Sequence, residues 1–401
     1  MKGKKFSVVC LVSIAVVLAL TVACAAPTAP AAKTIKVGAI YSFSGPGSEG
    51  EIIAKDAVPI VRDWINDNGG VTINGEKYLI DTIIEDGKGT VEGFVAAATK
   101  LVNVDKVKFI IGGNRPDLIF AIQSVTEPAK VLLSMGFGGG VPGIIGPDKP
   151  LSFWPSPHGA EEIKINYQYL VETYPNVKTV ALINEEGPGG DFFGAVSQAV
   201  AKAHGLNVVS MEMYPVGTRD FYPVWTKVLA TKPDMVDSGV AFGEQLAGIL
   251  KQGRELGYTG VIFTAGPISM DLILGMVGKD YGDKYLSNTF VNSPDMPPML
   301  NQITKMLEDK NIPAIRTSDV TLEWDSLWCS AQAIEKAQSL DPTEVAATWE
   351  KMTSIETSFG TGHMGGLKTY GSNHLVVRVI PITTLMKAEA QTVKWIMPEV
   401  P

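Results

Sequence analysis

Apolar residues follow two spacings along the chain. Short apolar runs such as 35–41 and 108–111 end in glycine-containing loops, which predicts buried β-strands. Segments such as 52–65 and 116–127 carry apolar residues three and four positions apart, which predicts helices with one buried face. Strands that alternate with helices in this way form parallel sheets covered by helices on both faces.

The alternation continues over most of the chain. Further strands are predicted at 78–85, 131–134, 179–183, 207–213, 234–238, 260–263 and 375–380, the last of them ended by Pro381. Further helices are predicted at 91–102, 159–173, 191–203, 220–230, 243–256, 297–308, 322–338 and 343–352. The Pro-rich segment 154–157 interrupts the pattern, so the sequence predicts an α/β fold of two doubly wound parallel-sheet lobes that divide near residue 155.

The first 32 residues do not follow this pattern. Three lysines among residues 2–5 precede an uncharged apolar run, 6–22, which is the layout of a secretory signal peptide. The stretch Leu20-Thr21-Val22-Ala23-Cys24 at its end resembles the lipobox of bacterial lipoproteins, in which the cysteine becomes the first residue and carries lipid. We therefore expect an exported protein, in the periplasm or at the outer face of the cell membrane.

Two interpretations of the segment around Cys24 are open. In the first, residues 1–23 are the signal peptide, Cys24 is lipidated, and the uncharged segment 24–32 is a tether between the lipid bilayer and the folded body. In the second, cleavage near Ala26 leaves no lipid. Several acyl chains on Cys24 would hold the protein stably at a membrane, and the lipidated form is the one we expect.

Charge and composition narrow the class of partner. The chain has a net charge of −8, and removal of the three lysines of the signal peptide makes it more acidic, which argues against a nucleic-acid partner. Cys329 is then the one cysteine beyond the lipid site, so we expect no internal disulfide and a buried apolar role for it. The four histidines lack the spacing of metal ligands, and neither a metal nor a cofactor is expected.

The loops that follow the predicted strands are the expected binding region. In doubly wound sheets, ligands bind beyond the carboxyl ends of the strands. The loops at 41–47, 111–115, 135–140 and 184–190 follow strands here, and they are rich in glycine and aromatic residues. Glycine allows backbone N–H groups to approach a ligand closely, so we expect a small-molecule solute at these loops.

Several motifs, in order, resemble one protein family. They are Ser44-Gly45-Pro46, Ile65-Asn66-Asp67-Asn68-Gly69-Gly70-Val71, Gly217-Thr218-Arg219-Asp220-Phe221, Leu250 to Gly257, and Trp324-Asp325-Ser326. Together they resemble the type I periplasmic binding proteins, specifically the branched-chain amino-acid and amide receptors of ABC transporters, over nearly the whole mature chain. The resemblance implies two lobes joined by three hinge crossovers, near residues 155, 288 and 360, that close on a ligand.

This resemblance also implies domain limits and ligand-binding positions. Lobe 1 would comprise 33–155 and 289–360, and lobe 2 would comprise 156–288 and 361–401. The candidate ligand-binding residues are Ser44, Gly45, Asn114, Arg115, Gly136, Phe137, Gly138, Trp154, Glu185, Phe242, Gly266 and Pro267.

Some of these positions depart from amino-acid recognition. In amino-acid-binding members, an acidic residue of the second lobe holds the ammonium group, and Gly266-Pro267 stands at that position here. An ammonium group enclosed without a partner is costly, so we expect a ligand other than a plain α-amino acid. Arg115 beside a helix N-terminus suits a carboxylate, although a surface pair with Asp117 explains it equally well.

Aromatic residues extend this expectation. Phe137, Trp154 and Phe242 would wall the site, which favours an aromatic or apolar carboxylate. A branched-chain amino-acid or amide receptor is the nearest alternative, and a ligand-sensing protein of the same fold is another. No nucleophile elbow, P-loop or dinucleotide fingerprint is visible, so we do not expect an enzyme. The sequence predicts a receptor that delivers a small solute to the permease of an ABC importer.

Overall fold

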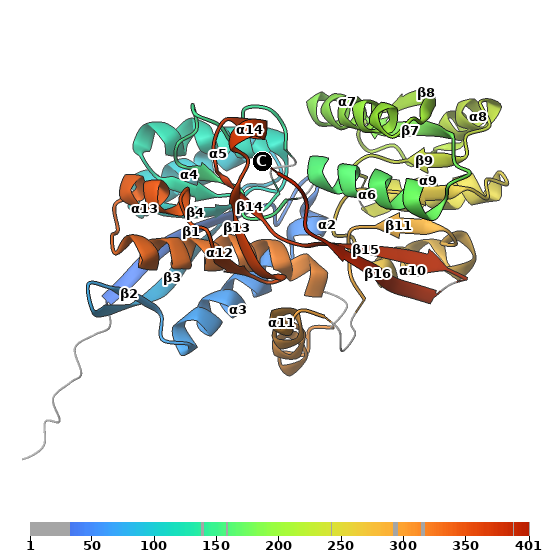
Figure 1. The fold of residues 1–401 in the computed structure, drawn as a ribbon. Helices are drawn as coiled ribbons and strands as arrows, with labels where there is room; N and C mark the ends of the chain where they lie inside the picture. Colours follow the sequence, from blue (N-terminus) through green and yellow to red (C-terminus); the bar gives the residue numbers. More distant parts are fainter. Residues whose placement is uncertain are drawn as a thin grey trace, which may run out of the picture.

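The computed structural model describes residues 33–137, 140–157, 159–241, 243–291, 296–313, 317–387 and 389–400. Two α/β bodies lie side by side, and each has a central sheet with helices on its faces (Figure 1). The predicted fold class, two doubly wound lobes with mainly parallel sheets, is confirmed.

The first sheet has six strands in the order β2-β3-β1-β4-β5-β6. Five of them run parallel: β1 (Lys33–Tyr41), β3 (Glu76–Asp86), β4 (Phe109–Gly112), β5 (Leu132–Ser134) and β6 (Ser152–Phe153). The short β2 (Val71–Ile73) pairs antiparallel with β3. The central strands β1, β4 and β5 are almost wholly apolar and buried, as expected for a parallel sheet covered on both faces.

Helices cover both faces of this sheet. On one face α4 (Val91–Asn103) contacts α5 (Pro116–Ala129). On the other face α3 (Ala54–Asp67) packs against α12 (Thr317–Ala337), which in turn contacts α13 (Pro342–Trp349). Apolar residues of α11 (Pro298–Asp309) join the same core, so the region after residue 296 folds back onto the first sheet.

The second sheet has seven strands in the order β16-β15-β11-β10-β9-β7-β8. Its parallel strands are β7 (Thr179–Glu185), β8 (Asn207–Tyr214), β9 (Met235–Asp237), β10 (Val261–Phe263) and β11 (Tyr285–Ser287). Its helices are α6 (Ala160–Thr173), α7 (Pro188–Ala203), α8 (Tyr222–Ala230), α9 (Gly243–Glu255) and α10 (Met270–Val277). α6 packs on α7, and α9 packs between α8 and α10, so this sheet also has helices on two faces.

The C-terminal region differs from the sequence-based prediction. One strand at 375–380 ended by Pro381 was expected, but the chain forms β14 (Leu375–Val377) and then a hairpin of β15 (Ile380–Met386) and β16 (Glu389–Ile396). Pro381 lies inside β15. It is tolerated because β11 pairs with β15 only at Thr383–Leu385, so Pro381 faces no strand on that side and no ladder bond is lost.

The chain passes between the two sheets between β6 and α6, between β11 and α11, and between β14 and β15. β14 belongs to a small sheet with β12 (Ile355–Thr357) and β13 (Gly360–Gly365), and its first residue bridges to Trp154 next to β6. The predicted domain limits stay a prediction. We propose that the third crossover lies between β14 and β15 rather than near residue 360.

A buried arginine lies where these passages meet. Arg378, between β14 and β15, and Asp325 of α12 are both fully buried, with 3.0 Å between Nε and Oδ2. Arg378 Nη2 donates a hydrogen bond to Ser156 Oγ of the first passage at 2.6 Å, and its guanidinium lies 3.7 Å from the centre of the Phe359 ring. Asp325 Oδ1 also accepts a hydrogen bond from the Ser358 amide at 2.6 Å.

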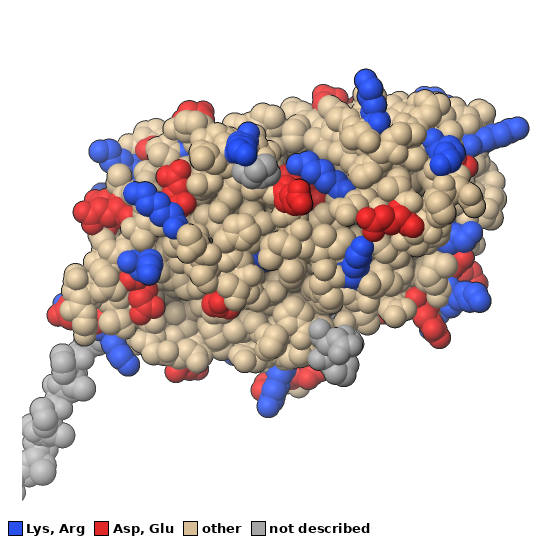
Figure 2. Space-filling model, viewed as in Figure 1, with Lys and Arg blue, Asp and Glu red and all other residues tan. Residues whose placement is uncertain are grey.

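This placement is unusual for a basic group in this protein, because Arg378 is the one buried Lys or Arg among the described residues, whereas several carboxyl groups are buried. On the face shown in Figure 2, the visible Lys, Arg, Asp and Glu side chains are scattered, with the two signs interspersed. A buried guanidinium requires a buried counter-charge, because desolvation penalises the unpaired ion strongly. Arg378 and Asp325 therefore tie two interlobe passages to α12.

Loss of the Asp325 carboxylate should destabilise the protein substantially. Asp325→Ala removes the carboxylate 3.0 Å from the buried Arg378 and leaves Glu162 as a carboxylate that still acts on it. Loss of one partner costs about 3–5 kcal/mol in comparable buried pairs. The matched control is Glu172→Ala, which removes a carboxylate 3.1 Å from Lys394 at the surface and should change stability little, because exposed ion pairs are screened by solvent. Urea unfolding measures both, and equal small losses would contradict the structural role given to Asp325.

Candidate functional site

The carboxyl ends of the parallel strands form one edge of each sheet, and the predicted ligand-binding residues lie there. Those with described positions follow or end β1, β4, β5, β6, β7 and β10: Ser44, Gly45, Asn114, Arg115, Gly136, Phe137, Trp154, Glu185, Gly266 and Pro267. Gly138, Phe242 and the expected lipid site Cys24 lie outside the described residues. The structure therefore places this set at the strand ends, where doubly wound folds bind ligands.

The loop after β1 is fixed to the end of β3. Ser44 Oγ donates to Asp86 Oδ2 at 2.7 Å, and the Phe43 amide donates to Asp86 Oδ1 at 2.9 Å. Partial burial opposes ionisation of Asp86, but these hydrogen bonds outweigh it and hold the pKa of the carboxyl below its usual value. Gly45 has φ +77°, and a Cβ there would lie 2.2 Å from the Lys88 carbonyl oxygen, so only glycine fits this turn.

Asn114 and Gly136 are brought together at the ends of the neighbouring strands β4 and β5. A Cβ on Gly136 would lie 2.3 Å from Asn114 Oδ1, so the amide occupies the space that a side chain would take. Asn114 Oδ1 is buried and has no hydrogen-bond partner among the described residues. A buried polar atom left unpaired is costly and marks a point where a ligand or water would bind.

Arg115 is the N-cap residue of α5 and forms the surface pair that was considered for it. Its Nε and Nη2 lie 3.2 and 2.7 Å from the two carboxylate oxygens of Asp117, and its side chain is 46% exposed. The fork uses two of the three guanidinium nitrogens. The third, Nη1, lies against the Gly47 turn, where a Cβ would be 3.9 Å away.

A residue that sequence analysis missed lies next to Arg115. Glu51 ends the short helix α2 (Ser48–Glu51) and is 6% exposed, and its Oε2 accepts a hydrogen bond from the Ser42 amide. Burial raises the pKa of Glu51 to about 7, against the opposing effects of the Ser42 hydrogen bond and the Arg115 charge. A four-residue helix has no periodic pattern, so the sequence contains no signal that Glu51 is buried.

The second sheet contributes a loop without a carboxylate. Residues 264–269 after β10 include Gly266, with φ +131°, and Pro267, but no Asp or Glu. Glu185 at the end of β7 is half-buried, and its Oε1 accepts a hydrogen bond from Gln245 Nε2 at 2.6 Å. The loop after β10 therefore contains no carboxylate that could hold an ammonium group. Glu185 is hydrogen-bonded to Gln245 of its own lobe.

Trp154 is more deeply buried than a side chain that lines an open cleft. It is fully buried, its ring meets that of Tyr370 edge-on at 6.2 Å, and its Cη2 would be 3.6 Å from a Cβ on Gly140. Its indole N–H has no hydrogen-bond partner among the described residues. Trp154 packs into the junction of the two bodies, and a ligand contact for it stays a prediction.

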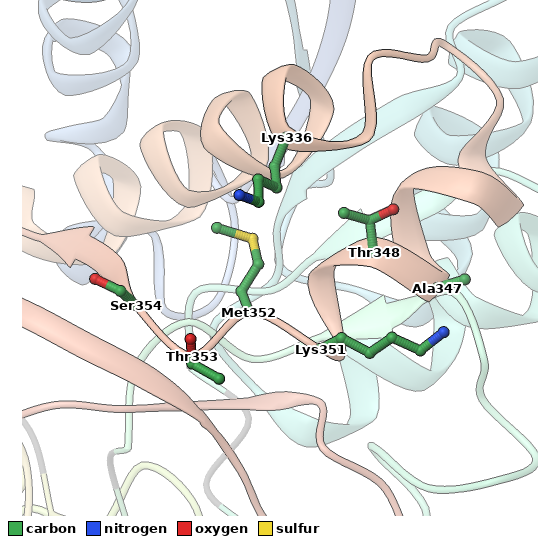
Figure 3. A pocket seen from close by; sticks show the side chains of 7 residues that line it. All are labelled: Lys336, Ala347, Thr348, Lys351, Met352, Thr353 and Ser354. Carbon is green, nitrogen blue, oxygen red and sulfur yellow. The ribbon is translucent and has the colours of Figure 1, made fainter.

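A surface pocket of about 390 Å³ lies elsewhere. Residues of α12, α13 and the loop before β12 line it: Lys336, Ala347, Thr348, Lys351, Met352, Thr353 and Ser354 (Figure 3). Lys336 lies beside Glu335, whose carboxylate accepts a hydrogen bond from the edge-strand residue Thr72. Ser326, near the middle of α12, accepts at its carbonyl oxygen a hydrogen bond from Ser134 at the carboxyl end of β5. The pocket is therefore far along α12 from the strand ends.

Asp237, the last residue of β9, supports the strand-end loops of the second sheet. Its Oδ2 accepts a hydrogen bond from Tyr167 Oη at 3.0 Å and its Oδ1 one from the Gly239 amide at 2.7 Å. Complete burial raises the pKa of Asp237 to about 6, and these hydrogen bonds limit the shift.

The described residues contain neither a metal-binding cluster nor a membrane-spanning helix. Within the described ranges, no group of three or more His, Cys, Asp or Glu side chains is arranged to hold a metal ion. Across the same ranges, no helix has both the length and the apolar character needed to cross a membrane.

Two mainly parallel sheets, with glycine-rich loops at their carboxyl ends and three chain passages between them, define a two-lobed solute-binding protein. The chain belongs to the periplasmic binding protein family, whose model matches residues 34–389. It is 25% identical over 323 residues to a Leu/Ile/Val-binding protein of Rhizobium johnstonii, an alignment that covers 78% of this chain and 82% of the relative.

Solved structures show the same fold. An amino acid ABC transporter substrate-binding protein from Pseudomonas fluorescens superposes with a TM-score of 0.77 at 16% identity, covering 92% of this chain and 97% of the other. A solute-binding protein from R. palustris in complex with 4-hydroxybenzoate gives 0.76 at 17% identity, covering 92% and 98%. The protein is thus a periplasmic binding protein, not an enzyme, and family membership implies export to the periplasm.

The pKa of Asp237 gives a prediction for stability against pH. Because this pKa is raised from 3.8 to about 6, the folded state binds the proton more tightly than the unfolded state. The free energy of unfolding therefore loses on the order of 3 kcal/mol from this group as pH rises from 4 to beyond 6. Relative to Asp237→Asn, which lacks the titrating carboxyl, the wild type should lose stability by about that amount over the same range in urea unfolding, and a difference that stays constant with pH would contradict the raised pKa of Asp237.

Proposed function

We propose that this protein captures an aromatic or apolar carboxylate at the strand ends of its two lobes and delivers it to the permease of an ABC importer. The observation that carries the proposal is the N-terminus of α5. This 14-residue helix has Arg115 as its N-cap residue and no side-chain cap, so the N–H groups that follow Pro116 and the Arg115 cation belong to the same helix end. Both favour a negative group.

The loop after β10 in the second lobe also supports a carboxylate ligand. A zwitterionic amino acid needs a partner for its ammonium group, and residues 264–269 have no carboxylate. A plain carboxylate makes no such demand. Similar solved structures include proteins in complex with benzoate, 4-hydroxybenzoate and 3,4-dihydroxybenzoic acid, which supports this ligand class for the fold.

A branched-chain amino-acid receptor is the second candidate. The curated relatives are Leu/Ile/Val-binding proteins, and a structurally similar protein from Streptococcus pneumoniae is in complex with isoleucine. Under this alternative, Glu185 would need to leave Gln245 to hold the ammonium group.

A thermal-shift screen of amino acids, benzoates, dicarboxylates and amides against the chain lacking residues 1–23 separates these candidates. We expect aromatic or apolar carboxylates to raise the melting temperature. Arg115→Ala should weaken their binding by about 2 kcal/mol, roughly thirtyfold in Kd by calorimetry, through loss of a charge-assisted contact. The control is Arg62→Ala, which breaks a comparable 2.7 Å pair with Asp63 within α3. Stabilisation by leucine-type amino acids alone would refute the carboxylate proposal.

We also propose that Cys24 carries lipid and holds the protein at the membrane through the tether 24–32. The supporting features are the basic start, the apolar run and the small residues before Cys24. Cys24→Ala should move the expressed protein from the membrane fraction to the soluble fraction, and labelled palmitate should no longer be incorporated. The matched control is Cys329→Ala, which changes the buried thiol of α12. Membrane retention of the Cys24→Ala protein would exclude the lipid anchor.

A further inference from the structure

Glu51 is a buried carboxyl at the proposed ligand site whose role is unexplained by the fold. It ends α2, which begins at the Gly47 turn against which Arg115 Nη1 lies. Its Oε2 accepts the Ser42 amide directly after β1, so the carboxyl is held at the carboxyl end of the first sheet. A helix end on the surface does not require a buried acid, and desolvation makes one costly.

The charged and titratable groups around Glu51 come from four further elements, α5, β1, α12 and α3. Arg115 and Asp117 of the α5 N-terminus act on it, the first favouring and the second opposing its ionisation. Tyr41 of β1 is fully buried, and both Glu51 and Glu323 of α12 act on its hydroxyl. Lys55, one turn after Glu51, lies 4.9 Å above the Phe43 ring.

The charge balance of this group depends on the protonation of Glu51. Asp117 already neutralises Arg115, because its two carboxylate oxygens accept hydrogen bonds from two guanidinium nitrogens. An ionised Glu51 therefore gives the Arg115–Asp117–Glu51 group a net negative charge, which repels an anionic solute. A protonated Glu51 leaves the group neutral and supplies an O–H donor where the ionised carboxylate has only acceptors.

We propose that Glu51 is a specificity-determining residue of this site, which takes up one proton from solvent when a carboxylate solute binds beside Arg115. The inference rests on the proposed function. The proton forms an O–H bond on the Glu51 carboxyl, and no other bond is made or broken. The site thereby selects anions without a second cationic side chain, because a carboxylic acid donates to a carboxylate whereas two carboxylates repel.

The free carboxyl has a pKa of about 7, which sets the pH range of the effect. Below that pH, Glu51 is already protonated and affinity is independent of pH. Above it, each binding event must add a proton, so Kd should rise about tenfold per pH unit. Capture is therefore strongest in a mildly acidic medium and weakens above neutrality.

Calorimetry of the mature chain with benzoate, the simplest aromatic carboxylate, tests this between pH 6 and 8.5. We expect Kd to rise about tenfold from pH 7.5 to 8.5, and titrations in phosphate and in Tris to show uptake of about one proton at pH 8. Glu51→Gln, which mimics the protonated acid, should bind with unchanged affinity over the range and without proton uptake. Glu92→Gln, at an exposed position of α4, should retain the wild-type profile.

The outcomes distinguish this inference from the proposed function. Benzoate binding with a pH-independent Kd and no proton uptake in the wild type would overturn the role of Glu51 and leave the carboxylate receptor standing. If Glu51→Gln kept the wild-type pH profile, another group would take up the proton, and this result would also overturn the role of Glu51. Failure of every carboxylate to bind at any pH would refute the proposed function and the inference together. Because wild-type proton uptake needs no variant, the test holds even if Glu51→Gln does not fold.

Discussion

Parallel pairing of the strands is the constraint on which the rest of this structure depends. Each parallel strand must be followed by a connection that returns over one face of the sheet, so every loop after a strand lies at the same edge. In the first sheet this brings the loops after β1, β4 and β5 together, although β1 ends at Tyr41 and β5 at Ser134. The site residues are therefore neighbours because of topology, and not because of local sequence.

Two sheets with separate strand-end edges form one receptor only if the chain joins them firmly. Two of the three passages are joined through the Arg378–Asp325 pair, which is fully buried and lies between α12 of the first body and the strand that enters the second. A pair of this kind has a strict geometry, since each charge needs the other where water is excluded. Its position therefore fixes the place at which the chain leaves one body for the other.

The sequence predicted most elements that have a clear period. The helices at 91–102 and 243–256 and the strand at 207–213 differ from the structure by one residue at an end. The C-terminal hairpin was missed because Pro381 was taken as a stop, which holds only where a strand is paired on both sides. At the site, Asn114 and Gly136 were predicted from loops and lie in contact, but Glu51 was not, because its four-residue helix carries no periodic pattern that would indicate burial.

The charge balance at the α5 N-terminus shows why a residue type alone does not define a ligand. Arg115 by itself indicates an anion site, yet Asp117 two residues later neutralises it, and Glu51 from a distant loop makes the group negative when ionised. What a carboxylate meets there is the sum of all three charges and the helix N-terminus, and one of the three is variable near neutral pH. Under the proposed function, anion recognition depends on the protonation state of this group, which tertiary packing sets by removing Glu51 from water.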